Sequence, residues 1–176
     1  MKQGHTIWFT GLPSAGKTTI ANQVAKRLRE LGISVIVLDG DVLRKTLSPG
    51  LGYSVKDRHR QLEIVTRVCN LISQNGVLSI VSTISHKKEF REYARSILSN
   101  FSEVYIKCPL EVCKKRDVKG LYKKYTIIPG KFVGVTLKYI EPENPEVILE
   151  TNKETISEST EKLLNYIIQL KQTGKK

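Results

Sequence analysis

The stretch Gly11-Leu-Pro-Ser-Ala-Gly16-Lys17-Thr18 decides the fold of this chain, because it matches the phosphate-binding loop pattern G-x-x-x-x-G-K-[ST] without a mismatch. The residues before it, Thr6-Ile-Trp-Phe-Thr10, predict a short buried strand, and residues 18–31 predict a helix. The motif requires this order of strand, glycine-rich loop and helix. A fortuitous glycine turn is the alternative interpretation.

The spacing of the motif predicts which atoms bind phosphate. Backbone N–H groups of such a loop surround a phosphate, and the N-terminus of the following helix adds partial positive charge. Lys17 would reach the β- and γ-phosphates, and the Thr18 hydroxyl would bind Mg²⁺. The predicted ligand is therefore a nucleoside triphosphate, ATP with magnesium. The predicted ATP-phosphate-binding residues are Gly11, Ser14, Ala15, Gly16, Lys17, Thr18 and Thr19.

The rest of the chain alternates strand and helix patterns. Four further β-branched runs predict strands at 34–38, 77–83, 104–107 and 147–149. Helical spacing of apolar residues predicts the helix that Gly32 ends, a long one from the Ser54-Val-Lys-Asp57 capping box to Gly76, one at 87–98, and a C-terminal one. This alternation predicts an α/β fold with a five-stranded, mostly parallel sheet and helices on both faces, in one domain over 1–176.

Two segments fit neither pattern, and both are rich in glycine, proline or basic residues. They span about 44–53 and 119–145. Long irregular segments in a compact domain are commonly lids or disordered. We expect mobile lids over the ligand edge of the sheet.

Composition narrows the function classes. The chain has 176 residues, 40% of them hydrophobic, and no apolar run reaches the length of a membrane span. Three cysteines without metal-ligand spacing, and no signal-peptide pattern, lead us to expect a cytoplasmic protein that does not enter a membrane. We interpret none of the three histidines as catalytic. The net charge of +12 fits a solvated basic surface or attraction of polyanionic substrates; nucleic acid is a less favoured partner, because no recognised nucleic-acid motif is present.

Charged residues follow the second predicted strand. Asp39-Gly40-Asp41 places two carboxylates at the ligand edge of the sheet, where one could orient the attacking hydroxyl or hold Mg²⁺. The alternative is an Asx turn and helix N-cap. Arg44 and Arg58 could bind phosphate or sulfate, or lie on a solvated face.

At this point the chain resembles adenylylsulfate (APS) kinase. The motifs are Asp39-Gly-Asp41-x-x-Arg44, Leu51-Gly-Tyr53-Ser-x-x-Asp57-Arg58, Ile84-Ser85 and the block from Pro109 to Lys124, which includes Arg116-Asp117-Val-Lys119. Their order and spacing hold from Ile7 to about Pro145. The resemblance implies a P-loop kinase that uses ATP to phosphorylate the 3′-hydroxyl of APS.

The resemblance also implies roles for residues at matching positions. Asp39 would be the catalytic carboxylate near the 3′-hydroxyl and, with Thr18, a Mg²⁺ ligand. Ser85 matches a serine that the family describes as a phosphoserine intermediate, although direct in-line transfer needs no covalent step. Tyr53 and Phe132 would sandwich the adenine; ordinary packing is the alternative for both. The implied acceptor-binding set is Asp41, Arg44, Tyr53, Arg58, Gln61, Lys119 and Phe132, and the implied nucleotide lid contains Arg116, Lys123 and Lys124. The family often forms homodimers.

Departures from the family pattern cluster on the acceptor side. Gln61-Leu-Glu-Ile64 replaces an Asn-Ile-Arg-Arg run, and His86 stands where proline is usual. The lid sequence after Lys124 differs as well. The same reaction on cytidine diphosphoramidate, an acceptor of related enzymes, is therefore the alternative. A non-catalytic P-loop protein that binds nucleotide or nucleic acid is a remote one.

Overall fold

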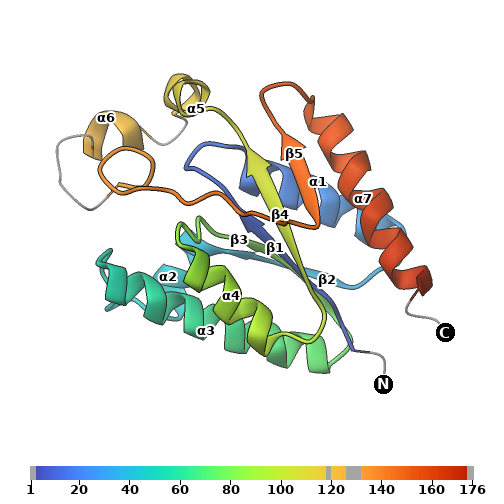
Figure 1. The fold of residues 1–176 in the computed structure, drawn as a ribbon. Coiled ribbons are helices and arrows are strands. Elements are labelled where there is room, and N and C mark those ends of the chain that lie inside the picture. Colours follow the sequence, from blue (N-terminus) through green and yellow to red (C-terminus); the bar gives the residue numbers. More distant parts are fainter. Residues whose placement is uncertain (1–2, 118–119, 126–131, 174–176) are drawn as a thin grey trace.

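The computed structural model describes residues 3–117, 120–125 and 132–173, and its centre is a five-stranded sheet. The strands are β1 Thr6–Thr10, β2 Val35–Asp39, β3 Leu78–Ser82, β4 Phe101–Lys107 and β5 Val147–Glu150. They lie in the order β2-β3-β1-β4-β5, and every pair is parallel. The predicted α/β class and five strands are confirmed (Figure 1).

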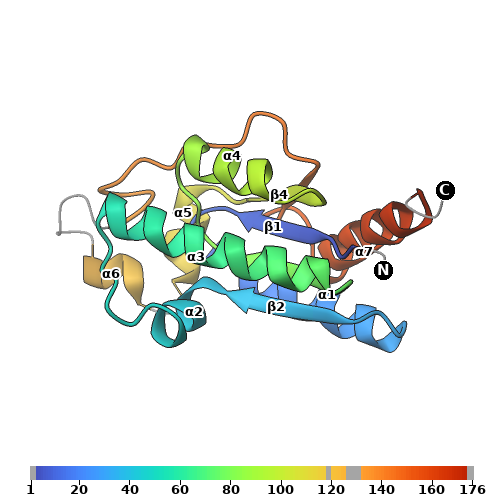
Figure 2. The same ribbon diagram turned by 90° about the horizontal axis from the view of Figure 1, so that it is seen from below.

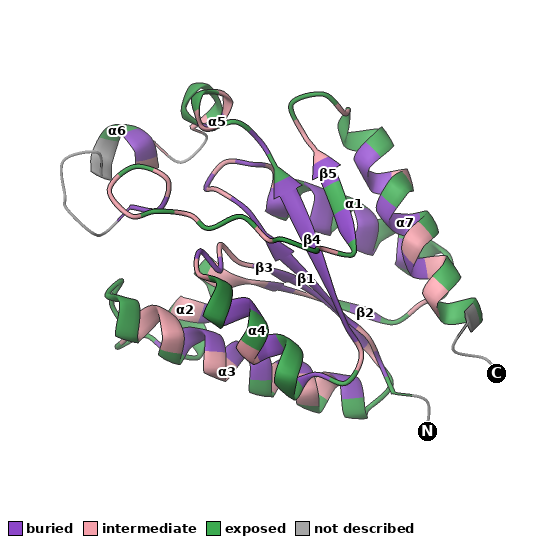
Figure 3. Ribbon diagram, in the orientation of Figure 1, coloured by how far each residue is buried: buried purple, intermediate pink, exposed green. Residues whose placement is uncertain are grey.

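Helices cover both faces of the sheet, because side chains of successive strand residues point to opposite faces. In β1, Ile7 and Phe9 pack in a core with α1 (Lys17–Glu30) and α7 (Ile156–Thr173). Trp8 belongs to the opposite core, with α2 (Gly40–Thr46), α3 (Val55–Gln74) and α4 (Lys88–Ile97). Figure 2 shows the sheet between these two groups of helices, and Figure 3 shows all of β1 buried.

The long helices begin and end close to their predicted positions. At the end of α1, Gly32 N donates to Arg29 O at 2.9 Å and has a φ of 71°, as in a glycine that follows a helix. Ser54 caps α3, since its hydroxyl accepts from Asp57 N at 3.1 Å and donates to Asp57 Oδ2 at 2.7 Å. The predicted capping box is therefore confirmed in its serine half.

The irregular segments contain more helix than the sequence pattern predicted. Residues 44–46 continue α2, so the first segment begins inside a helix. Two short helices were also not predicted. The helix α5, Leu110–Arg116, precedes the second segment, and α6, Leu121–Tyr125, lies within it. A helix of five to seven residues is too short to show an apolar periodicity, which explains why they were missed.

The topology places the loops of interest together. All five strands are parallel, so the loops after β1, β2, β3 and β5 emerge at the same edge of the sheet. That edge carries Asp39, Ser85 and the phosphate-binding loop. In the described part of the chain, none of the helices combines the length and the apolar character that crossing a membrane requires.

Candidate active site

The phosphate-binding loop follows β1 directly and needs glycine at both ends. Gly11 has a φ of 153°, and a Cβ there would lie 2.5 Å from the carbonyl oxygen of Ile106 on β4. Gly16 has a φ of 105°, a conformation that side chains other than glycine's rarely adopt. The two glycines of the motif are therefore required by the path of the backbone.

Contacts from distant segments hold the carbonyl groups of this loop. The Tyr122 hydroxyl of α6 donates to Pro13 O at 3.0 Å, and the Thr151 hydroxyl donates to Ala15 O at 2.7 Å. In a trans peptide the N–H points opposite to the C=O. The N–H groups of Ser14 and Gly16 therefore point away from these contacts, as phosphate binding requires.

Lys17 and the start of α1 provide positive charge at the loop. The Lys17 ammonium donates to Gly11 O at 2.9 Å and Leu12 O at 2.7 Å, so it lies inside the curve of the loop. The N-cap residue of α1 is Gly16, which has no side chain to cap the helix. The first-turn N–H groups are therefore available to an anion rather than satisfied by a capping side chain.

Asp39 connects the phosphate-binding loop to the end of β2. Its Oδ2 accepts from the Thr18 hydroxyl at 2.8 Å, while its Oδ1 accepts from Asp41 N at 2.9 Å and Val42 N at 3.3 Å. The capping interpretation of this aspartate is thus confirmed, and the same carboxylate still presents one oxygen to Thr18. A hydroxyl and a carboxylate oxygen side by side are ligands that suit Mg²⁺.

The described residues include no group of three or more His, Cys, Asp or Glu side chains that could hold a metal ion by themselves. Mg²⁺ in kinases is bound by one or two protein oxygens together with substrate phosphates. Thr18 and Asp39 fit that kind of site and not an all-protein cage.

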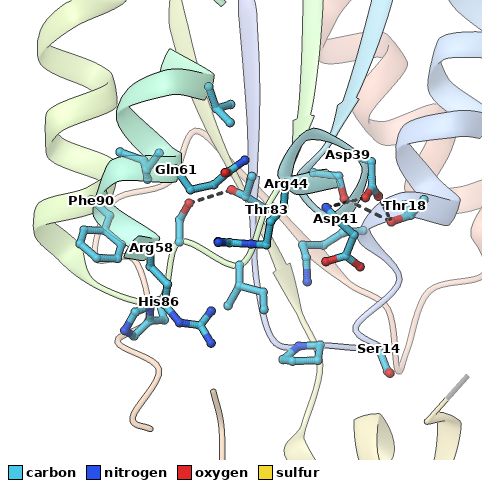
Figure 4. A pocket seen from close by; sticks show the side chains of 18 of the residues that line it. Ser14, Thr18, Asp39, Asp41, Arg44, Arg58, Gln61, Thr83, His86 and Phe90 are labelled. Carbon is cyan, nitrogen blue, oxygen red and sulfur yellow. Dashed lines mark hydrogen bonds between the residues drawn. The ribbon is translucent and has the colours of Figure 1, made fainter. Parts of the chain in front are cut away.

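A cavity of about 410 Å³ extends from the phosphate-binding loop to α3 and the loop between β3 and α4 (Figure 4). Its wall combines the charged residues of the predicted site with apolar side chains such as Leu62 and Phe90. The predicted residues that line it are Ser14, Gly16, Lys17, Thr18, Thr19, Asp39, Asp41, Arg44, Tyr53, Arg58, Gln61 and Ser85. The structure therefore brings most of the predicted site together.

Arg44 and Arg58 share one aromatic ring at this cavity. Their guanidinium carbons lie 4.8 and 5.4 Å from the centroid of the Tyr53 ring. Arg44 donates to Gly52 O at 2.6 Å, and Arg58 Nε donates to Tyr53 O at 3.0 Å. Burial, followed by the charge of Arg44, lowers the pKa of Arg58. Two neighbouring cations in a half-buried site would be stabilised by an anionic ligand.

Ser85 lies at a backbone position under strain. Its φ is 42°, in the left-handed region that serine rarely occupies. The Ser85 hydroxyl accepts from Trp8 Nε1 at 3.1 Å and is 2.7 Å from Thr83 Oγ1, and Arg91 donates to the Ser85 carbonyl at 2.8 Å. The surrounding residues thus hold this loop in one shape, with Ser85 at the cavity wall.

Other predicted residues lie apart from the cavity. The ring of Phe132 is buried, edge-on to Tyr122 with 4.8 Å between centroids, so it packs in the core while Tyr53 lines the cavity with half of its surface exposed. Arg116 lies behind the loop and donates to Thr151 O at 2.5 Å. Gly11 and Ala15 form the loop backbone, and Lys123 is exposed on α6. Lys119 and the side chain of Lys124 lie outside the described residues.

The sequence analysis missed several residues of this region. Thr151 directly follows β5, and this position at the ligand edge of the sheet is the only sequence feature that could have indicated a role at the site. The helical spacing of Leu62 and Val65 predicts only a core position, and both lie in the core while also lining the cavity. His86 was identified only as a departure from a family pattern, and it lines the cavity.

Comparisons with known proteins agree with this geometry. Residues 3–150 match the family model described as adenylylsulphate kinase. The adenylyl-sulfate kinase of Rippkaea orientalis is 45% identical over 163 residues, covering 92% of this chain and 90% of the relative. The probable adenylyl-sulfate kinase of Pyrococcus abyssi is 49% identical over 162 residues, covering 90% and 92%. The Mycobacterium tuberculosis APS kinase CysC, solved with AMPPNP and APS, superposes with a TM-score of 0.91 at 37% identity, covering 95% of this chain and 99% of that one.

Proposed function

The chain belongs to the adenylylsulphate kinase family, and on that premise we propose that it transfers the γ-phosphate of ATP to the 3′-hydroxyl of adenylylsulfate. The products are ADP and 3′-phosphoadenylylsulfate. The enzyme is a phosphotransferase with an alcohol group as acceptor.

One observation carries the proposal beyond family membership: a single cavity joins the phosphate-binding loop to the pair Arg44 and Arg58. Asp39 and Asp41 line it between these two regions, as Figure 4 shows. A phosphate donor at the loop and an anionic acceptor at the arginines would therefore meet near the carboxylates. In-line phosphoryl transfer requires this arrangement of donor, acceptor hydroxyl and carboxylate.

The residues of the chain supply positioning and charge for this reaction. Loop N–H groups and Lys17 bind the phosphates and stabilise the charge that spreads over the transferred group. Asp39 accepts from Thr18 and can orient or deprotonate the 3′-hydroxyl, while Arg44 and Arg58 hold the phosphosulfate. A bound Mg²⁺ at Thr18 and Asp39 would neutralise phosphate charge. No covalent role for Ser85 is needed, because a direct transfer completes the reaction.

The identity of the acceptor is tested by ADP release with Mg·ATP and a panel of adenylylsulfate, cytidine diphosphoramidate, AMP and CMP. We expect the highest kcat/KM with adenylylsulfate. A preference for the cytidine compound would contradict the proposed acceptor while preserving the proposed reaction. The altered acceptor-side residues, Gln61 and His86, are the reason to include that compound.

The proposed reaction also suggests where the enzyme works and what its net charge does. We propose that it works in the cytoplasm, where ATP and Mg²⁺ are available. The net charge of +12 would then attract anionic nucleotides; nucleic-acid binding that survives physiological salt would argue against this interpretation. Homodimer formation stays a prediction, to be measured by light scattering at several protein concentrations.

A further inference from the structure

His86 lies in the loop between β3 and α4, with 2% of its surface exposed. Its carbonyl accepts from Ile140 N at 2.9 Å, and its ring packs edge-on against Phe90 with 5.2 Å between centroids. The preceding residue, Ser85, is fixed by Arg91. The position of the imidazole is therefore determined by the fold.

Although the ring is fixed, the chain does not use all of its hydrogen-bonding capacity. The buried Nε2 of His86 has no hydrogen-bond partner among the residues that the structure describes. Leaving a buried polar atom unpaired destabilises the folded state, because the atom loses its hydrogen bonds to water without replacement. Such a cost calls for an explanation, and a ligand in the adjoining cavity, which His86 lines, provides one.

A second residue that lines this cavity, Gln61, also has a buried nitrogen without a hydrogen-bond partner among the described residues. The Ser48 hydroxyl donates to Gln61 Oε1, which orients the amide, and Gln61 Nε2 has no partner within the described part of the chain. Gln61 comes from α3 and His86 from the β3–α4 loop, so two residues that line one cavity from separate elements each carry a buried nitrogen that is unpaired in the described structure. Their coincidence favours a ligand over an isolated packing defect.

The charges around His86 indicate which chemistry the ligand has. Figure 4 shows the imidazole beside the guanidinium of Arg58. Burial, together with the charges of Arg58 on α3, Lys87 and Arg91, lowers the pKa of His86 to about 4, against a smaller opposing effect of Glu89. At neutral pH the ring is therefore uncharged and carries one N–H. It offers a hydrogen bond without adding a third cation beside Arg44 and Arg58.

We propose that His86 is a specificity residue for the acceptor, donating a hydrogen bond from Nε2 to the terminal oxyanion of the acceptor's 5′-phosphoanhydride, which Arg44 and Arg58 hold by charge. The inference rests on the proposed kinase reaction and adds a residue to its acceptor side. A sulfate or phosphoryl terminus meets the requirement equally, because both present oxyanions. A nucleoside monophosphate does not, because its 5′-phosphate has no further group attached.

The test compares acceptors with and without the terminal group. His86→Leu keeps the approximate volume and removes the nitrogen, while His86→Asn keeps a neutral N–H donor. For His86→Leu we expect kcat/KM with adenylylsulfate to fall about 10- to 100-fold, mainly through KM, as for the loss of a hydrogen bond to a charged group. The inhibition constant of AMP against adenylylsulfate should change less than about twofold. His86→Asn should recover part of the loss.

The matched control is His59→Leu. The ring of His59 also packs against Phe90, with 5.5 Å between centroids, and His59 does not line the cavity. Its kinetics should stay within about twofold of the wild type, and the KM for ATP should stay unchanged in every variant.

Two results would overturn the assignment: an unchanged kcat/KM in His86→Leu, or an equal loss of affinity for adenylylsulfate and AMP, which would indicate a structural role. The proposed function is judged separately, by the wild-type activity. If the wild type prefers cytidine diphosphoramidate, the same comparison with CMP decides the role of His86. If His86→Leu does not fold, His86→Met removes the nitrogen in its place, and His86→Asn remains the variant that keeps an N–H donor.

Discussion

The hydroxyl of Thr18 donates a hydrogen bond of 2.8 Å to Oδ2 of Asp39, across the gap between the phosphate-binding loop and the end of β2. The other oxygen of the carboxylate caps α2. The two functions of Asp39 can therefore be separated by mutation.

Asp39→Asn should keep the cap and remove the charge, because asparagine caps helices about as well as aspartate. We expect a fall in kcat on the order of 10²-fold or more and a small change in melting temperature. Asp39→Ala should lose activity and also about 1 kcal/mol of stability through the missing cap. Steady-state kinetics and urea denaturation of the two variants measure the difference. An unchanged kcat in Asp39→Asn would remove this carboxylate from the mechanism.

Lys17→Ala should reduce kcat by about 10²- to 10³-fold, since it removes a charge that stabilises the transferred phosphoryl group. The fold should persist, because the contacts of Tyr122 and Thr151 with the loop carbonyls do not involve Lys17. The matched control is Lys26→Ala, a change at an exposed lysine further along α1 that does not line this cavity. Similar losses in both variants would point to a general effect of charge instead.

Arg58→Ala should raise the KM for the acceptor about tenfold or more and leave the KM for ATP within a factor of two. Arg60 is the control: it lies two residues away on α3, pairs with Glu63 at 2.8 Å and does not line the cavity. Initial rates at varied acceptor and fixed saturating ATP provide the measurement. A rise in the KM for ATP alone would place Arg58 on the wrong substrate.

Thr151→Val should weaken ATP binding through the loop that it supports. The substitution removes the hydrogen bond to Ala15 O while preserving the shape of the side chain. The loss of one such bond corresponds to about 1 kcal/mol, or about a fivefold rise in the KM for ATP. Thr160→Val, on α7, removes a hydroxyl bonded at 2.6 Å to Ile156 O and serves as the control. Equal KM values for ATP in Thr151→Val and the wild type would contradict this support.

Stability should fall at acid pH through His86. Its pKa is lowered to about 4 in the folded chain, chiefly by burial, from an ordinary value of 6.5. The unfolded chain therefore binds the proton more tightly, and the free energy of unfolding decreases as pH falls from about 6.5 toward 4, by a few kcal/mol at most. Burial also lowers the pKa of His5, which adds to the same trend.

Urea denaturation at pH 7.5, 6 and 5 measures this dependence. His86→Asn cannot titrate there and should show a flatter profile than the wild type, with His59→Asn as the control. Parallel profiles in all three proteins would mean that His86 is not responsible.

The sequence predicted the strands and helices whose own residues show a clear hydrophobic periodicity. The strands are short and rich in β-branched residues, and β1 and β3 are buried along their whole length. The helices α1 and α3 carry long apolar stripes, so their periodicity can be recognised in the sequence alone. Asp39 and Asp41 could be placed at the cavity because they follow a strand whose direction was predictable. The sheet topology then brings Asp39 into contact with Thr18.

The remaining features depend on contacts between distant segments. Phe132 sits in a glycine- and proline-containing stretch that gives no periodic signal, and its burial against Tyr122 is decided by tertiary packing. The left-handed backbone of Ser85 is fixed by Trp8 and Arg91, one from β1 and one from α4. A local sequence pattern contains no record of such partners, which is why these positions were predicted by resemblance or not at all.

The hydrogen bond from Thr151 to Ala15 has a consequence for how the protein is made. Ala15 is synthesised early, but Thr151, whose hydroxyl bonds its carbonyl, is added 136 residues later. The strand β5, which positions Thr151, must also add to the sheet first. Nascent chains that end before residue 151 should therefore bind ATP more weakly than the complete chain even when β1 and α1 have formed, so full affinity for the nucleotide is reached only late in synthesis.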